Sequence, residues 1–361
     1  MKRRDFLKTS VTAAAAATLP WRGALAEAPW RTFEATTQIE ILRASGVSRA
    51  WLPLPIIDNG DWQRVIGSDW SGNATVAQVR NDGKYGVSML YAEWRAGEQQ
   101  PVLELTSRFA TRDRAIDLSK PNPNAERLSA AEHAFYTAPS ELIPTDGIVR
   151  TTALEVTKGA RTDVEKARAI YEWVVENTYR DPKTRGCGWG DIKAMLENRN
   201  FGGKCGDLNA MYVGLARSVN LPARDVYGIR VAASNLGYRS LGANSASISK
   251  AQHCRAEFFA QGHGWVPVDP GDVRKVILEE PPGNLAMTHE RVVAARKRLF
   301  GSWEMNWLAF NMGHDVVLPN AARDTKLPYL MYPNGETGGE GLDQLEPDAF
   351  KYSISWRELK T

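Results

Sequence analysis

Residues 202–224 read GGKCGDLNAMYVGLARSVNLPAR, and this stretch decides the fold. The paired glycines permit a tight entry into a helix, which places Cys205 in the first turn. Apolar residues recur at helical spacing from Leu208 to Val219, and Asn220-Leu221-Pro222 ends the pattern. A thiol in the first turn faces the positive end of the helix dipole, which lowers its pKa. The stretch therefore predicts a buried helix that begins with an activated thiol; a thiol with only a packing role is the alternative.

Two downstream segments supply a base and a carboxylate for this thiol. HCRAEFF at 253–259 and WVPVDP at 265–270 predict two strands joined by a short turn. In such a hairpin the start of the first strand lies near the end of the second, so we expect His253 and Asp269 to be neighbours. A carboxylate on one imidazole nitrogen fixes the tautomer, and the other nitrogen can then take a proton from a thiol. We predict a catalytic triad of both residues with Cys205.

These motifs, in this order, resemble the transglutaminase-like proteins of bacteria. The resemblance rests on GKCGDLNA at 203–210, on LAR and PAR within 215–224, and on the two strand motifs above. It covers about residues 147–318 and implies an α+β fold, with a transglutaminase-like (papain-like cysteine protease) core preceded by an antiparallel β-sandwich. It also implies that Cys205 is the nucleophile, His253 the acid and base, and Asp269 the orienting residue, with a thioester intermediate and no cofactor. Arg255 departs from the pattern, because many members carry an aromatic residue there.

The donors that would hold an oxyanion are less clearly marked. The backbone N–H of Cys205 is one candidate, because it lies at the start of a helix. Trp189 and Tyr179 precede the nucleophile and carry N–H and O–H groups, so either is a candidate second donor, with core packing as the alternative. Trp303 and Trp307 belong to an aromatic segment that predicts a core strand, and a place in the cleft is the alternative.

The two remaining cysteines, Cys187 and Cys254, are expected to be buried thiols. Side chains alternate along a strand, so Cys254 should point to the face opposite His253. A Cys187–Cys254 disulfide is the alternative, since an odd number of cysteines leaves at least one thiol unpaired. A zinc site from Cys187, Cys205, Cys254 and His253 has suitable ligand types but irregular spacing, so we expect no metal.

Outside the catalytic domain at 147–318, the chain divides by composition into the leader and three further parts. Residues 28–117 contain short alternating strands with turn signals and predict the β-sandwich. Residues 118–146 are rich in Pro and Asn and predict a linker to the catalytic domain. Residues 319–361 follow that domain as a C-terminal extension, with a mobile loop expected at 334–346 and a last strand near 352–356.

The first 26 residues have the pattern of an export signal. RRDFLK at 3–8 resembles the twin-arginine box, a weakly apolar run follows at 10–19, and Ala24-Leu25-Ala26 suits a signal peptidase. This leader has a charge of +4 against +3 for the whole chain, so the remainder sums to −1. The basic excess therefore gives no argument for nucleic-acid binding. We expect twin-arginine export to the periplasm, and no later stretch is long and apolar enough for a membrane span.

Together these features predict a periplasmic cysteine peptidase or amidase whose substrate is a peptide or protein, with the cell envelope as one source. Hydrolysis is favoured over amine transfer because the glycines around Cys205 and the polar stretch at 232–250 suggest an open site, and Arg255 would add charge. A protein-glutamine acyl transferase that cross-links proteins is the alternative. A non-catalytic binding module of the cell envelope is a third possibility, which an intact triad argues against.

Overall fold

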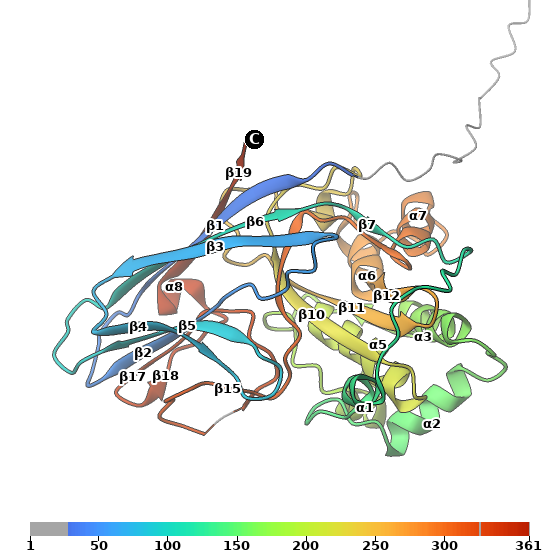
Figure 1. Ribbon diagram of the computed structural model, residues 1–361, viewed down its shortest axis with the longest axis horizontal. Coiled ribbons are helices and arrows are strands. Elements are labelled where there is room, and N and C mark those ends of the chain that lie inside the picture. The colour runs from blue at the N-terminus through green and yellow to red at the C-terminus, as the bar shows by residue number, and fades with distance from the viewer. Residues whose placement is uncertain (1–27, 325, 361) are drawn as a thin grey trace, which may run out of the picture.

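The computed structural model describes residues 28–324 and 326–360, which form two lobes lying side by side (Figure 1). One lobe consists of two stacked β-sheets, and the other is a third sheet covered by helices. The predicted leader, residues 1–26, lies outside the described residues. Among the residues that are described, no helix has both the length and the apolar character needed to cross a membrane.

The first lobe is an antiparallel β-sandwich. One sheet has the order β19 (Tyr352–Leu359), β1 (Arg31–Glu40), β6 (Val102–Thr111) and β3 (Gln63–Gly72). The other has the order β18 (Glu340–Gly341), β17 (Asn334–Thr337), β2 (Ser48–Pro53), β5 (Ser88–Trp94) and β4 (Val76–Asn81). Alternate side chains of both sheets, among them Phe33, Leu52, Trp94 and Phe109, are buried in one shared apolar core. The predicted sandwich is confirmed.

The C-terminal segment is part of this sandwich rather than an extension of the second lobe. Strand β19 pairs with β1, so that Ile354 lies opposite Thr37, and β17 pairs with β2. The last strand expected near 352–356 is confirmed, but the loop expected at 334–346 is wrong for its first part, where β17 and β18 form a hairpin. The composition of this segment could not show that its pairing partners lie at the opposite end of the chain.

The second lobe is built on a four-stranded antiparallel sheet with the order β12–β11–β10–β14. Its strands are β12 (Gly264–Val268), β11 (Gln252–Ala260), β10 (Ala223–Arg230) and β14 (Trp307–Asn311). The main helices of this lobe are α2 (Gly147–Val156), α3 (Asp163–Asn177), α4 (Ile192–Glu197), α5 (Cys205–Ser218), α6 (Pro270–Glu279) and α7 (Glu290–Arg298). Short elements complete the chain: β7 (Arg114–Ala115), α1 (Ala130–Thr137), β8 (Tyr179–Arg180), β9 (Gly202–Gly203), η1 (Arg239–Leu241), β13 (Ser302–Trp303), β15 (Val316–Val317), β16 (Lys326–Leu327) and α8 (Pro347–Phe350).

Helix α1 lies inside the predicted linker at 118–146, which is therefore not a featureless connection. The helix begins at a capping box in which Ser129 and Glu132 each satisfy the other's backbone N–H. This signal is present in the sequence, but the neighbouring prolines and asparagines obscured it.

Helix α5 lies at the centre of the second lobe, and every residue along it is buried. It packs against strand β11 and helices α2, α3 and α6, and its apolar side chains belong to the largest core cluster. Gly214 is required for this close packing, because a Cβ at that position would lie 2.1 Å from the side chain of Ile192. The predicted helix is confirmed, and Cys205 is its first residue.

Substitution of Ile354 tests whether the last strand stabilises the sandwich. Ile354→Ala removes a side chain buried in the shared core, so we expect a loss of about 2–5 kcal/mol in the free energy of unfolding. Ser353→Ala, on the exposed side of the same strand, is the matched control and should change it by less than about 0.5 kcal/mol. Urea titration measures both, and equal effects would show that β19 does not contribute to the core.

Candidate active site

Asp269 lies where strand β12 ends and helix α6 begins. Pro270 opens the helix, so Asp269 is its N-cap residue, and its Oδ1 accepts the backbone N–H of Asp272 at 3.0 Å. Its Oδ2 accepts a hydrogen bond from Nε2 of His253 at 2.7 Å. Both side chains are buried. The structure therefore brings together the two residues that the hairpin pattern placed side by side.

His253 can reach the Asp269 carboxylate because it lies on the part of β11 that has no β12 residue opposite it. Pairing of β11 with β12 starts at Ala256 and Val268, so the beginning of β11 pairs with β10 alone among the described strands. The imidazole can therefore turn toward the start of α6. The indole N–H of Trp307 donates to the backbone oxygen of His253 at 3.1 Å, which fixes the main chain below the ring.

Asn209 links helix α5 to strand β11 and to the carboxylate of Asp269. Its Nδ2 donates to Oδ1 of Asp269 at 3.3 Å and to the backbone oxygen of Cys254 at 2.8 Å. Asn209 follows Cys205 by four residues, so both lie on the same face of α5. Asn209 was not predicted as a site residue. The available signal was its position four residues after Cys205, the predicted nucleophile, on the same helix.

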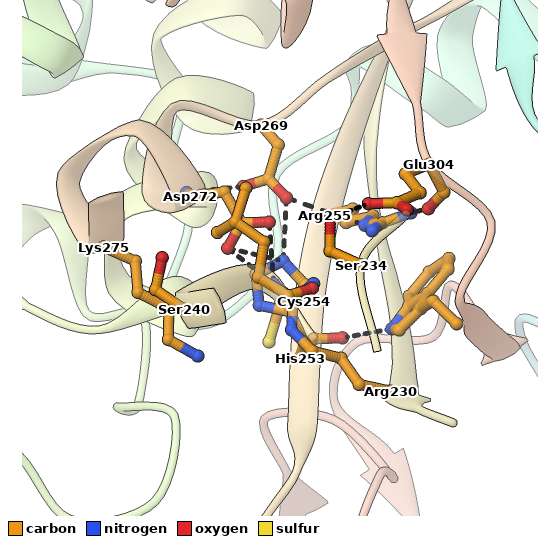
Figure 2. A network of polar contacts seen from close by, with 12 residues as sticks. Arg230, Ser234, Ser240, His253, Cys254, Arg255, Asp269, Asp272, Lys275 and Glu304 are labelled. Carbon is orange, nitrogen blue, oxygen red and sulfur yellow. Dashed lines mark hydrogen bonds and ion pairs between the residues drawn. The ribbon is translucent and has the colours of Figure 1, made fainter. Parts of the chain in front are cut away.

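A second carboxylate, Asp272, also lies beside the imidazole. Its Oδ1 is 3.4 Å from Nε2 of His253, and both of its oxygens accept from one guanidinium nitrogen of Arg230 at 2.6 and 2.7 Å. Figure 2 shows His253 next to both carboxylates, with Arg230 on strand β10 in the same network. Sequence analysis missed Arg230 and Asp272, because a charged pair 42 residues apart has no local signature.

Arg255 belongs to the same network of charged side chains, because its guanidinium lies beside the carboxylate of Asp269. Its Nε lies 3.6 Å from Oδ2 of Asp269, and its guanidinium carbon lies 4.7 and 5.4 Å from the ring centres of Trp307 and Trp303. Arg255 is buried, so it does not add a charge to an open cleft as expected, and this argument for hydrolysis is wrong. The two tryptophans are likewise buried, which confirms their predicted place in the core.

Comparison with known proteins places this arrangement in a family. Residues 150–270 match the model of the transglutaminase-like superfamily, and residues 1–20 match that of the twin-arginine translocation signal sequence. The chain belongs to the transglutaminase-like superfamily. It carries a twin-arginine signal sequence and is exported to the periplasm. The predicted family, fold class and location are confirmed.

Individual relatives extend this likeness over most of the chain. An uncharacterised protein of Haemophilus influenzae is 34% identical over 328 residues, which cover 88% of each chain. A Cytophaga hutchinsonii protein, whose name proposes a cysteine protease, has the same fold, with a TM-score of 0.57, 13% identity and 93% of each chain covered. The periplasmic domain of TgpA from Pseudomonas aeruginosa gives a TM-score of 0.34 at 14% identity, covering 76% of this chain and 89% of that one. That likeness is too low to support an argument.

The charges around the imidazole balance. The carboxylates of Asp269 and Asp272 face the guanidiniums of Arg230 and Arg255, so the four groups sum to zero. Burial and Arg230 would lower the pKa of His253, but Asp272, Asp269 and the Cys205 thiolate outweigh them and raise it to about 9. The imidazole of this transglutaminase-like site is therefore protonated at neutral pH.

The sulfur of Cys205 is surrounded by two other thiols. Hydrogen bonds from Cys187 and Cys254, with the charge of His253 as a further cause, lower the pKa of Cys205 well below its ordinary value. The three Sγ atoms lie within 4.8 Å of one another, and all three are free thiols. The Cys187–Cys254 disulfide is therefore not present. His253 groups with Asp269 and Asp272 instead of with the sulfurs, so the four zinc ligands considered above fall into two sets within the described part of the chain.

Cys254 lies beside Cys205, although it was predicted only to point to the strand face opposite His253. Cys254, Ala256 and Phe258 point to the face of β11 on which α5 packs. His253 lies where β11 pairs with β10 but not with β12, and the first turn of α5 lies close enough to contact both His253 and Cys254. The alternation of side chains along β11 predicts that His253 and Cys254 point to opposite faces, but it does not predict that the start of α5 contacts both residues.

A glycine-rich loop is held against the first turn of α5 by Asp207. This carboxylate accepts the backbone N–H of Gly190 and of Lys204, each at 2.9 Å, and Gly206 donates to the backbone oxygen of Cys187 at 2.7 Å. Across residues 28–324 and 326–360, no acceptor is found for the N–H of Cys205. That N–H is therefore available to a developing oxyanion.

The two other candidate oxyanion donors differ in position. The Tyr179 ring packs on Gly202, and its hydroxyl donates to Oδ1 of Asn200 at 3.3 Å. Trp189 lies in the loop held by Asp207, and it is 60% exposed. Trp189 therefore remains the stronger candidate for a second donor.

The pH dependence of alkylation tests the ion pair. We expect the rate at which iodoacetamide labels Cys205 to be nearly constant below about pH 8.5, where an ordinary thiol loses about tenfold per pH unit. The proton on His253 is present below about pH 9 and lost above it, so turnover should fall as the pH rises through about 9. Peptide mapping by mass spectrometry gives the labelling rate of each cysteine.

The control for this experiment is His253→Ala, which should raise the pKa of Cys205 and move the start of the pH slope upward, while the hydrogen bonds from Cys187 and Cys254 still keep this pKa below its ordinary value. Equal labelling of Cys187, Cys205 and Cys254 in the unmodified protein would contradict the assignment of Cys205 as the activated thiol.

Proposed function

We propose that this protein is a periplasmic cysteine peptidase or amidase that cleaves amide bonds of peptides or proteins. The observation that carries the proposal is the hydrogen bond from Nε2 of His253 to Asp269, because it leaves Nδ1 to exchange a proton with Cys205. A scaffold without catalytic activity would have no use for a buried thiolate–imidazolium pair, which argues against a binding module.

The residues account for each step of an acyl transfer to water. The Cys205 thiolate attacks the amide carbonyl carbon, and the oxyanion accepts from the N–H of Cys205 and from the indole of Trp189. Nδ1 of His253 then donates its proton to the amine as the C–N bond breaks, which leaves a thioester. The neutral imidazole next takes a proton from water, the hydroxide displaces the sulfur, and the acid is released. Asp269 keeps the ring oriented throughout and remains ionised.

Water is the acceptor that the site favours. Cys205 is only 4% exposed, so the open site expected from the glycines and the polar stretch is wrong, and an acceptor must reach a buried sulfur. Water needs less room to reach a buried thioester than the amine of a protein does. The name of the Cytophaga hutchinsonii neighbour, which proposes a cysteine protease, points the same way. Cross-linking of proteins through glutamine is the competing outcome.

Asp269→Asn tests the orienting role. The amide can donate to Nε2, which reverses the tautomer, so we expect kcat to fall by about 10³-fold or more while the fold is kept. His253→Ala should be at least as damaging. His263→Ala, in the turn between β11 and β12, is the matched control and should leave turnover unchanged. Hydrolysis of a peptide amide library measures activity, and circular dichroism checks the fold; loss of turnover only in the control would refute the triad.

Partitioning of the thioester tests the choice of acceptor. With an amide substrate and a labelled primary amine together, we expect mostly acid product, with little label in the amide product. Quantification of both products by mass spectrometry gives the ratio directly. Predominant incorporation of the amine at about millimolar concentration, where enzymes commonly saturate, would assign the protein to the acyl transferases instead.

A further inference from the structure

Two thiols that the proposed mechanism does not use lie next to the nucleophile. Cys187 and Cys254 are both buried, and their sulfurs are each within 4.8 Å of the sulfur of Cys205. The hydroxyl of Tyr332 donates to Sγ of Cys187 at 3.2 Å, and this sulfur also lies 3.4 Å from the backbone oxygen of Gln252. Cys187 is therefore held as a protonated thiol that points into the space beside the catalytic sulfur.

The two thiols differ in how freely they can move. Cys187 lies between Gly186 and Gly188, whose φ angles of +56° and +87° belong to the region that favours glycine. Its main chain already contacts the first turn of α5 through the bond from Gly206. Cys254 lies within strand β11 and is paired with Tyr227 of β10. A sulfur–sulfur bond is about 2.05 Å long, so one side chain must approach Cys205, and the loop residue can do so without breaking a sheet.

Export exposes the catalytic sulfur to oxidation. The periplasm is an oxidising compartment, and a thiolate is the form of cysteine that peroxides attack. A sulfenic acid can still be recovered, but oxidation to the sulfinic acid is irreversible for nearly all proteins. A second thiol beside the nucleophile stops the oxidation at the first stage by forming a disulfide.

We propose that Cys187 is the resolving thiol of Cys205. The Cys205 thiolate attacks a peroxide oxygen, the O–O bond breaks, and hydroxide leaves, so that a sulfenic acid remains. The sulfur of Cys187 then attacks the sulfur of Cys205; the S–S bond forms, the S–O bond breaks, and the oxygen departs as water with the proton of Cys187. Two thiols are oxidised and one peroxide is reduced to water. The enzyme is thereby inactivated reversibly, and a dithiol returns both residues to thiols.

Mass spectrometry of the mature protein treated with hydrogen peroxide tests this assignment without any substrate. We expect the intact mass to fall by about 2 Da, and proteolysis to yield a peptide pair that joins Cys205 to Cys187. Dithiothreitol should restore the original mass and iodoacetamide labelling at Cys205. In Cys187→Ser the nucleophile should instead gain about 32 Da as a sulfinic acid that dithiothreitol does not reverse.

Cys254→Ser is the matched control, because it removes the other neighbouring thiol and should leave the Cys205–Cys187 link intact. The proposal is overturned if the unmodified protein accumulates sulfinic acid at Cys205 as fast as Cys187→Ser. It is also overturned if the link joins Cys254 to either other cysteine. The second outcome is read from the unmodified protein alone, so it does not depend on whether a variant folds, and neither outcome needs an identified substrate.

Discussion

The hydrogen bond between Asp269 and His253 is made away from water, and much of the surrounding structure is needed to make that possible. A buried carboxylate is stable only when other groups replace its hydration. Here the first turn of α6 supplies a backbone N–H, Asn209 supplies an amide, and Arg255 supplies a positive charge. The end of β12 and the starts of α5 and α6 must therefore converge on one point, and this convergence defines the second lobe.

The buried Asp269–His253 pair also requires that the charges around it balance. Asp272 lies one helical turn after Asp269, so the two carboxylates would repel each other without compensation. Arg230 neutralises Asp272 by donating to both carboxylate oxygens, and Arg255 lies beside Asp269 and over the rings of Trp303 and Trp307. Removing one member of such a buried set leaves an uncompensated charge, whereas the complete set is tolerated. The arginine that replaces the family's aromatic residue is thus explained by its environment.

Local patterns predicted the parts of this protein that depend on neighbours in sequence. The helix that starts at Cys205 and the hairpin that joins His253 to Asp269 were both predicted, because each is specified within about 20 residues. The partners of Asp272 and the pairing of β19 with β1 were not predicted, because they depend on contacts between segments that are far apart in the sequence. The closeness of Cys254 to Cys205 was not predicted for a related reason: alternation along a strand fixes the face of a side chain but not which helix end lies beside that face.

The pairing of β19 with β1 has a consequence for the order of events in the cell. Strand β1 begins soon after the leader and leaves the ribosome long before β19. Until β19 has been made, β1 is therefore an edge strand with unpaired backbone groups; β19 then covers β1 and becomes the edge strand in its place. A nascent or prematurely terminated chain would expose that edge to other polypeptides, as a site for aggregation or for a holding chaperone. Pairing of β19 with β1 thus distinguishes a chain that has been made as far as β19 from a shorter one.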